Sequence, residues 1–195
     1  MSASGDAAPV IAIDGPSASG KGTIAAAVAR HLGFHYLDSG ALYRVAGFAA
    51  GEQGIDLDSD RDVSRITLNL NVNFDGDHIV LGTRDVSEAI RGEAAGAAAS
   101  RVAALPGVRT ALMALQKSYR RLPGLVADGR DMGSVVFPDA VLKICLTATA
   151  GERAQRRHKQ LMEKGINANI ADLLHDIQKR DERDSNRSIA PLQQG

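Results

Sequence analysis

The stretch GPSASGKGT, Gly15 to Thr23, is the part of the sequence around which the rest of the chain is organised. It follows an apolar run, Val10–Ile13, that is typical of a short buried strand, and it precedes residues 24–32, which we expect to be helical. A strand, a glycine-rich turn and a helix form the context of a phosphate-binding P-loop. The glycines let successive backbone N–H groups point into one concavity, and Lys21 adds a full positive charge.

Composition narrows the class of protein. The 195 residues predict one domain, and a hydrophobic fraction of 44% is enough to form a core. With 23 basic and 23 acidic residues the net charge is zero, which argues against a general nucleic-acid-binding protein. No stretch approaches the ~18 apolar residues of a membrane span. We therefore expect a cytoplasmic protein without a membrane or nucleic-acid partner.

Two short features add to this expectation. Residues 1–9 are small and polar and lack the pattern of a signal peptide, so we interpret them as a flexible leader. The single cysteine, Cys145, excludes an internal disulfide and lies in an apolar run, which predicts a buried thiol.

The next segment predicts further elements of an α/β core. Residues 34–37 indicate a second strand and residues 41–50 a helix. Because ligands bind at the carboxyl ends of strands in doubly wound sheets, we expect Ser39 and Arg44 near the phosphate loop. For Arg44, a solvated position on the helix surface is an equally good interpretation.

The middle of the chain has a different pattern. Residues 51–63 indicate a loop, residues 68–74 alternate as a half-buried strand does, and a turn at 75–77 leads to a return strand at 78–82. An antiparallel hairpin does not belong inside a parallel core, so we expect a small inserted lobe. Two helices follow, at 88–105 and 107–119, and Ser100 and Arg109 flank the break between them.

The sequence after the lobe returns to the core. Leu125–Asp128 is a short apolar run that ends in an acid, as in a Walker B element, where the acid lies near Mg²⁺. Arg130 and Asp131 follow in a turn bracketed by glycines, where charged residues usually contact a ligand. Residues 142–148 predict another strand.

The last segments, 152–165 and 170–187, predict helices rich in arginine. Each has three arginines at helical spacing, so that they share one face: Arg153, Arg156 and Arg157 in the first, and Arg180, Arg183 and Arg187 in the second. A charged run is usually a solvated face. The excess of arginine, whose planar fork fits phosphate oxygens, keeps a phosphoryl-transfer site open as a second interpretation.

Four motifs together resemble one family. GPSASGKGT, LDSGALYR, LPGLVADGRDMGSVVFPDA and RDERDSNRSIAP occur in this order in bacterial cytidylate kinases, which are P-loop nucleoside monophosphate kinases. The resemblance extends from about residue 10 to the end of the sequence and implies ATP-dependent phosphorylation of CMP and dCMP, with Mg²⁺ bound to ATP. It implies an α/β fold: a P-loop NTPase-type parallel sheet flanked by helices, an inserted antiparallel hairpin lobe and a helical lid.

The resemblance also implies the boundaries and the site residues. We expect one kinase domain over residues 10–195, a monophosphate-binding lobe at about 40–121 and a lid at about 151–170. The residues implied to bind ATP are Gly15, Pro16, Ser17, Ala18, Ser19, Gly20, Lys21, Gly22, Thr23, Arg153 and Arg157, with Thr23 and Asp128 near the metal. Those implied to bind CMP are Ser39, Arg44, Ser100, Arg109, Arg130, Asp131, Arg180, Asp184 and Arg187. Catalytic roles fall to Lys21, Arg130, Arg180 and Arg187.

The sequence departs from the family at one point and leaves alternatives open. Family members usually continue past the closing motif with a last strand and helix, which this sequence lacks. A P-loop GTPase would need an NKxD motif, which is absent. A kinase of another small anionic acceptor, such as UMP or shikimate, and an inactive nucleotide-binding fragment remain as alternatives. We expect ATP, CMP and dCMP as partners of a monomer.

Overall fold

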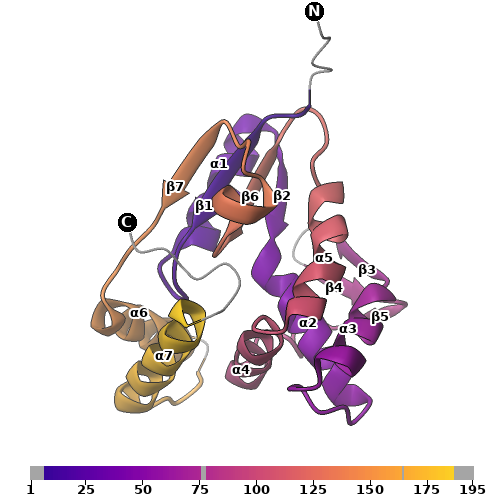
Figure 1. The fold of residues 1–195 in the computed structure, drawn as a ribbon. Helices are drawn as coiled ribbons and strands as arrows, with labels where there is room; N and C mark the ends of the chain where they lie inside the picture. The colour runs from indigo at the N-terminus through magenta and orange to yellow at the C-terminus, as the bar shows by residue number, and fades with distance from the viewer. Residues whose placement is uncertain (1–6, 76–77, 164, 187–195) are drawn as a thin grey trace, which may run out of the picture. The chain divides into compact units, whose positions relative to one another are not determined.

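A computed structural model describes residues 7–75, 78–163 and 165–186 of the chain (Figure 1). The chain divides into two compact units. The first, here the core unit, contains the residues up to Leu37 and those from Tyr119 onward. The second, here the inserted unit, is Asp38–Ser118 and overlaps the segment in which the sequence predicts a lobe.

A four-stranded sheet with the order β2-β6-β1-β7 forms the centre of the core unit. The central strand β1 runs parallel to both of its neighbours, so that Ile13 lies opposite Asp128 on one side and Ile144 on the other. This arrangement confirms the predicted α/β class with a parallel sheet. The strands of this sheet are β1 (Val10–Asp14), β2 (His35–Asp38), β6 (Leu125–Gly129) and β7 (Leu142–Cys145).

The two faces of β1 have different neighbours because side chains alternate along a strand. Ile11 and Ile13 pack in one cluster with Ala25 and Ala29 of α1 (Lys21–Leu32). On the opposite face, a Cβ atom built on Gly133 would lie 3.3 Å from the Cβ atom of Ala12. Gly133 belongs to the short helix η1 (Met132–Val136), so α1 and η1 cover opposite faces of the strand that leads into the phosphate loop.

Two helices, α6 (Ala150–Glu163) and α7 (Ile170–Ser185), complete the core unit and pack against one another (Figure 1). A capping box begins α6: the Thr149 hydroxyl accepts from the Glu152 N–H at 3.2 Å, and Glu152 Oε2 accepts from the Thr149 N–H at 2.9 Å. On α7, the Asn169 side chain accepts from the Ala171 N–H and caps the first turn. At the start of both helices, a side chain therefore accepts a hydrogen bond from an N–H group of the first turn.

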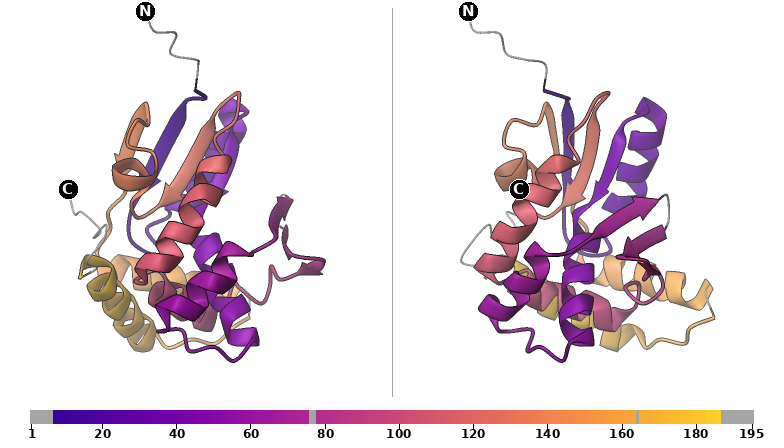
Figure 2. Two further views of the ribbon diagram at one scale, coloured as in Figure 1. Left: turned by 45° about the vertical axis from the view of Figure 1, so that its right-hand side comes forward. Right: turned by 90° about the vertical axis from the view of Figure 1, so that its right-hand side faces the viewer.

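The inserted unit combines four helices with a three-stranded antiparallel sheet in the order β3-β4-β5. Val45, Val86 and Ile90 form its buried cluster, against which apolar residues of the small sheet pack. Figure 2 shows this sheet extending from the helices of the same unit. The elements are α2 (Ser39–Glu52), α3 (Asp60–Leu68), β3 (Val72–Asp75), β4 (His78–Leu81), β5 (Arg84–Asp85), α4 (Glu93–Val102) and α5 (Pro106–Ser118).

Helix α3 contradicts two sequence-based expectations, the loop at 51–63 and a strand that starts at residue 68. Val63 and Thr67 lie one turn apart on the buried side of this helix. Leu68, which ends α3, is 69% exposed, so its place in the alternating pattern is a coincidence of sequence. The predicted strand therefore starts only at Val72.

Other boundaries also differ from expectation. The helix predicted at 88–105 begins only at Glu93, because residues 88–91 form a turn. The strand predicted at 142–148 ends at Cys145, and this cysteine is exposed rather than buried because β7 is an edge strand of the described sheet. The short elements β5 and η1 were not expected at all.

The ends of the described chain bear on two further expectations. Of the predicted leader, residues 1–6 lie outside the described residues, whereas Ala8 is buried and its carbonyl accepts from Arg120 Nε at 2.7 Å. None of the helices in the described part of the chain is long and apolar enough to cross a membrane.

We predict that Ile90→Ala lowers the free energy of unfolding by about 2–4 kcal/mol, because the substitution leaves a cavity in the buried cluster of the inserted unit. Ile90 is 1% exposed. The matched control is Leu68→Ala, at a position 69% exposed, which should change the free energy by less than about 0.5 kcal/mol. Urea unfolding of both variants makes the comparison, and equal losses would contradict the assignment of this core.

Candidate phosphate-binding site

The phosphate loop joins the end of β1 at Asp14 to the start of α1 at Lys21. Gly20 precedes the helix with a φ angle of 92°, a left-handed conformation that glycine adopts without steric strain. At Gly15 a side chain would collide with the carbonyl of Leu146, so only glycine fits there. The N-cap residue of α1 is Gly20, which has no side chain to cap the helix, so the first N–H groups can face an anion.

Asp14, at the base of the loop, fixes the turn that follows β6. Its two carboxylate oxygens accept from the backbone N–H groups of Met132 and Gly133, each at 2.8 Å. Burial raises the pKa of the Asp14 carboxyl above the ordinary value of 3.8, the two hydrogen bonds oppose this rise, and the charge of nearby Asp131 adds to it. The carboxylate thus connects the phosphate loop to the turn that carries Arg130 and Asp131.

Asp128 lies beside the start of α1. It is 3% exposed, and its Oδ2 atom accepts from the hydroxyl of Tyr36 at 2.6 Å. A Cβ atom built on Gly22 would lie 3.4 Å from the same oxygen. The acid at the end of β6 therefore lies next to the GKGT segment, as a Walker B acid does.

Two arginines of α6 bind the phosphate loop through its backbone carbonyls. Arg153 Nη1 donates to the Ser17 carbonyl at 3.2 Å, and Arg156 Nη1 donates to the Ser19 carbonyl at 3.0 Å. The two arginines are three residues apart, so they lie on one side of the helix. The arginine face that the sequence predicts thus contacts the phosphate loop from outside the loop.

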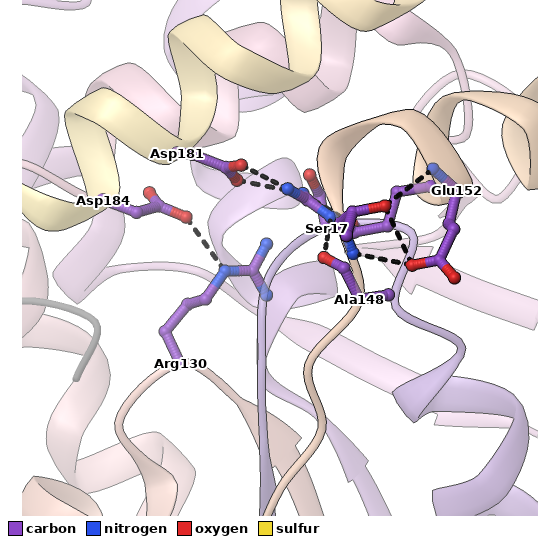
Figure 3. A network of polar contacts seen from close by, with 8 residues as sticks. Ser17, Arg130, Ala148, Glu152, Asp181 and Asp184 are labelled. Carbon is purple, nitrogen blue, oxygen red and sulfur yellow. Dashed lines mark hydrogen bonds and ion pairs between the residues drawn. The ribbon is translucent and has the colours of Figure 1, made fainter. Parts of the chain in front are cut away.

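Two acids of α7 pair with arginines, and Figure 3 shows both contacts from close by. Asp181 makes a bidentate ion pair with Arg153, and Asp184 Oδ2 accepts from Arg130 Nε at 2.9 Å. The side chains of Arg153 and Asp184 are only 4% and 5% exposed, so both charges depend on their partners.

The inserted unit holds the other predicted residues. Ser39 is buried at the first position of α2, and Asp38 Oδ1 caps this helix by accepting from the Ala41 N–H at 3.0 Å. Arg44 Nη1 donates to the Ile90 carbonyl at 3.2 Å. Ser100 and Arg109 are both buried, and the hydroxyl of Ser100 has no hydrogen-bond partner among the residues that the structure describes.

The predicted site residues therefore fall into two groups, one in each unit. The core unit contains the phosphate loop, Asp128, Arg130, Asp131, Arg153, Arg157, Arg180 and Asp184, and the inserted unit contains Ser39, Arg44, Ser100 and Arg109. Arg187 lies outside the described residues. For Arg44, contact with a buried carbonyl argues against the alternative of a purely solvated side chain.

Sequence reasoning missed four residues that shape the site: Asp14, Tyr36, Arg156 and Asp181. Arg156 belongs to the predicted arginine face, and Asp181 lies in the closing RDERD motif, so both had a local signal. Asp14 ends an apolar strand just as Asp128 does, which was a usable signal for an acid at the site. Tyr36 had none, because only the fold brings it to Asp128.

The sequence predicts that Thr23 and Asp128 lie near the metal ion. Their hydroxyl and carboxylate oxygens are the hard donors that Mg²⁺ prefers, and Asp128 lies next to the helix turn that carries Thr23. Within residues 7–75, 78–163 and 165–186 no group of three or more His, Cys, Asp or Glu side chains could hold a metal by itself.

We predict that Asp14→Asn lowers the free energy of unfolding at pH 7 by about 1–3 kcal/mol, because one amide oxygen cannot serve two buried N–H groups. Since the folded-state pKa of Asp14 is raised, its titration contributes stability that is complete below pH 3.8 and is lost as the pH rises through the folded pKa. The difference in free energy of unfolding between the wild type and Asp14→Asn should therefore shrink as the pH rises from 3.8 through the folded-state pKa.

Urea unfolding at a series of pH values measures this difference. Asp58→Asn is the control, because its stability difference from the wild type should depend on pH in the opposite direction. The hydrogen bond from Arg101 lowers the pKa of Asp58, so its contribution is present above pH 3.8 and is lost as the pH falls. A difference for Asp14 that grows with pH would contradict the assignment.

Comparison with known proteins agrees with the geometry. The sequence model described as cytidylate kinase matches residues 11–195. The cytidylate kinase of Nitrosomonas europaea is 58% identical over 95% of this chain and 83% of its own length. That of Bordetella bronchiseptica is 57% identical over 98% of this chain and 86% of its own. The solved structure of TT1252 from Thermus thermophilus aligns with 95% of this chain and 87% of the TT1252 chain at 18% sequence identity. The TM-score of 0.45 is too low to bear on the fold. The chain belongs to the cytidylate kinase family.

Proposed function

We propose that this protein transfers the γ-phosphoryl group of ATP to CMP and dCMP by direct in-line attack. One observation carries the proposal: a glycine-rich loop leads into the uncapped start of α1 at Lys21, while arginines of α6 bind the loop carbonyls. Such a loop presents its N–H groups to a polyphosphate. Family membership supports the same reaction.

The donor nucleotide is assigned to the core unit. We assign the phosphates of ATP to the N–H groups of Gly15–Thr23, with the ammonium group of Lys21 at the β- and γ-phosphates. Arg157, half-buried on α6, is the lid arginine that we assign to the phosphates. Mg²⁺ bound with ATP would neutralise charge on the phosphate oxygens, and Thr23 and Asp128 would hold it.

The acceptor nucleotide is assigned to the remaining residues that the family resemblance implies. Arginine forks suit the phosphate of the monophosphate, and we assign this role to Arg44, Arg109, Arg130, Arg180 and Arg187. Ser39, Ser100 and Asp131 supply hydroxyl and carboxylate groups for the phosphate and the base. The buried hydroxyl of Ser100, which has no hydrogen-bond partner among the described residues, is the type of group that a substrate polar atom can satisfy.

Asp184 takes a second role beside the predicted contact with sugar hydroxyls. Its Oδ2 atom accepts from Arg130 Nε, so the carboxylate also orients the guanidinium that we assign to the acceptor phosphate. Nη1 of Arg130 donates to the Gly129 carbonyl at 3.4 Å, and we assign the remaining Nη hydrogens to the acceptor phosphate. An Asp184 variant should therefore disturb both the sugar contact and the phosphate contact.

The reaction needs no general base. The phosphate of a nucleoside monophosphate is largely dianionic at neutral pH, because its second pKa is about 6. The acceptor oxygen is therefore already a nucleophile, and the remaining problem is repulsion between two anions. Fixed cations address this problem, since Lys21 and the arginines stabilise charge that spreads over the transferring group.

A coupled assay of ADP release tests the substrate assignment. The full chain is assayed with ATP and, in turn, CMP, dCMP, UMP, AMP and shikimate, and we expect turnover to be greatest with the two cytidine nucleotides. Preference for UMP or shikimate would support the alternative of another small anionic acceptor. Binding of ATP and CMP without release of ADP would identify an inactive nucleotide-binding protein.

We predict that Lys21→Ala lowers kcat with CMP by about 10³-fold or more, because a fixed cation is lost at the transferring phosphoryl group. The control is Lys159→Ala, which removes a lysine of α6 whose side chain is 80% exposed. Circular dichroism checks that both variants fold. Near wild-type turnover of Lys21→Ala would refute the assignment of the loop.

We predict that Ser100→Ala raises KM for CMP by about 5- to 10-fold and leaves KM for ATP unchanged, because one hydrogen bond to the acceptor is lost. The control is Ser118→Ala on α5, whose exposed hydroxyl donates to the Leu115 carbonyl at 2.7 Å. Initial rates with each substrate varied in turn give both constants. An equal rise in the two KM values would remove Ser100 from the acceptor site.

A further inference from the structure

The guanidinium of Arg153 is almost fully occupied by contacts within the protein. Its Nε atom donates to the Ala148 carbonyl at 3.0 Å, and Nη1 donates to the Ser17 carbonyl at 3.2 Å and to Asp181 Oδ1 at 3.0 Å. Nη2 donates to Asp181 Oδ2. An arginine has five N–H groups, so these contacts leave one for any other partner. Figure 3 labels Asp181, Ala148 and Ser17, the residues whose oxygen atoms accept these hydrogen bonds.

Burial makes these contacts hard to exchange. The Arg153 side chain is 4% exposed and that of Asp181 is 24% exposed. If Arg153 turned away to bind a phosphate, it would leave the Asp181 carboxylate and two backbone carbonyls without their donor. Separation of a buried ion pair is strongly unfavourable, because it leaves an uncompensated charge. Arg153 is thus more deeply buried than Arg157, which is half-buried and which the sequence assigns to the same role.

The contact with Ser17 acts on the shape of the loop. The peptide group is planar, so the direction of the Ser17 carbonyl fixes the direction of the Ala18 N–H on the other side of the same plane. Ala18 has a φ angle of 57°, which is a left-handed conformation that a residue with a side chain adopts at a cost of about 1–2 kcal/mol. A hydrogen bond to the carbonyl just before Ala18 helps to hold this strained residue.

We propose that Arg153 is a positioning residue of the phosphate loop and not a ligand of ATP. Asp181 orients the guanidinium, the guanidinium holds the Ser17 carbonyl, and the loop thereby keeps the N–H groups of residues 17–20 directed at the phosphates. This proposal rests on the proposed function in one respect, which is that the loop binds ATP. It replaces the role that the sequence gives to Arg153.

Calorimetric titration with ATP and with ADP separates the two roles. We expect Asp181→Asn and Arg153→Ala each to raise the Kd of both nucleotides by roughly 10-fold, by the same factor for each, because the damage lies in the shared loop. The double variant, which combines Asp181→Asn with Arg153→Ala, should raise each Kd by no more than either single variant does. The Kd of CMP should change far less.

A ligand role for Arg153 predicts a different outcome. Asp181 would then compete with the phosphates, and Asp181→Asn would release the arginine and tighten ATP binding. A lower Kd for ATP in Asp181→Asn would therefore overturn the proposal. A rise in the Kd of ATP but not of ADP in Arg153→Ala would overturn it as well. The matched control is Asp176→Asn, which changes an exposed acid of the same helix and should leave all Kd values as in the wild type.

Hydrogen–deuterium exchange tests the same proposal without nucleotide. We expect faster exchange of the amides of residues 17–20 in Asp181→Asn and Arg153→Lys than in the wild type and in Asp176→Asn. Thermal unfolding checks that each variant is folded. Unchanged exchange in both variants would overturn the proposal. If the wild type failed to bind ATP, the proposed function would fail, while the exchange result would still decide whether Arg153 holds the loop.

Discussion

The ion pair between the buried Arg153 and the partly buried Asp181 connects three segments of the core unit. A guanidinium can be buried only if most of its N–H groups find acceptors, and here the acceptors come from three separate segments. The strand β7 ends just before Ala148, the phosphate loop supplies Ser17, and α7 supplies Asp181. One buried cation therefore connects segments that are far apart in sequence, and the shape of the loop depends on all of them.

Local features of this protein could be predicted from its sequence, whereas long-range contacts could not. The phosphate loop depends on a strand, a turn and a helix that follow one another directly, so Gly15–Thr23 could be identified from pattern alone. Helix α3 was missed because a run of alternating residues overlaps its last turn at Leu68. The contact of Asp14 with Met132 crosses most of the chain, and no spacing rule indicates it.

The arginine faces illustrate the same limit for the site. Their spacing correctly indicated that Arg153 and Arg156 share one side of α6, but it could not show which partner each would meet. The structure gives both of them backbone carbonyls of the loop, so an arginine-rich face near a phosphate site is not always a set of phosphate ligands. Such a loop offers N–H groups that can bind an anion and carbonyls that can accept from arginines, as those of Ser17 and Ser19 do here.

Asp181 and Asp184 lie three residues apart on α7, with Arg153 bound to one and Arg130 to the other. The rise of an α-helix is about 1.5 Å per residue, so the two carboxylates are separated along the helix axis by a fixed interval. The helix therefore sets the spacing between Arg153, which binds the phosphate loop, and Arg130, which follows β6. A point substitution can weaken either contact alone. The insertion of a single residue between the two acids would instead rotate one of them by about 100° about the helix axis relative to the other, so that the two ion pairs could not form together.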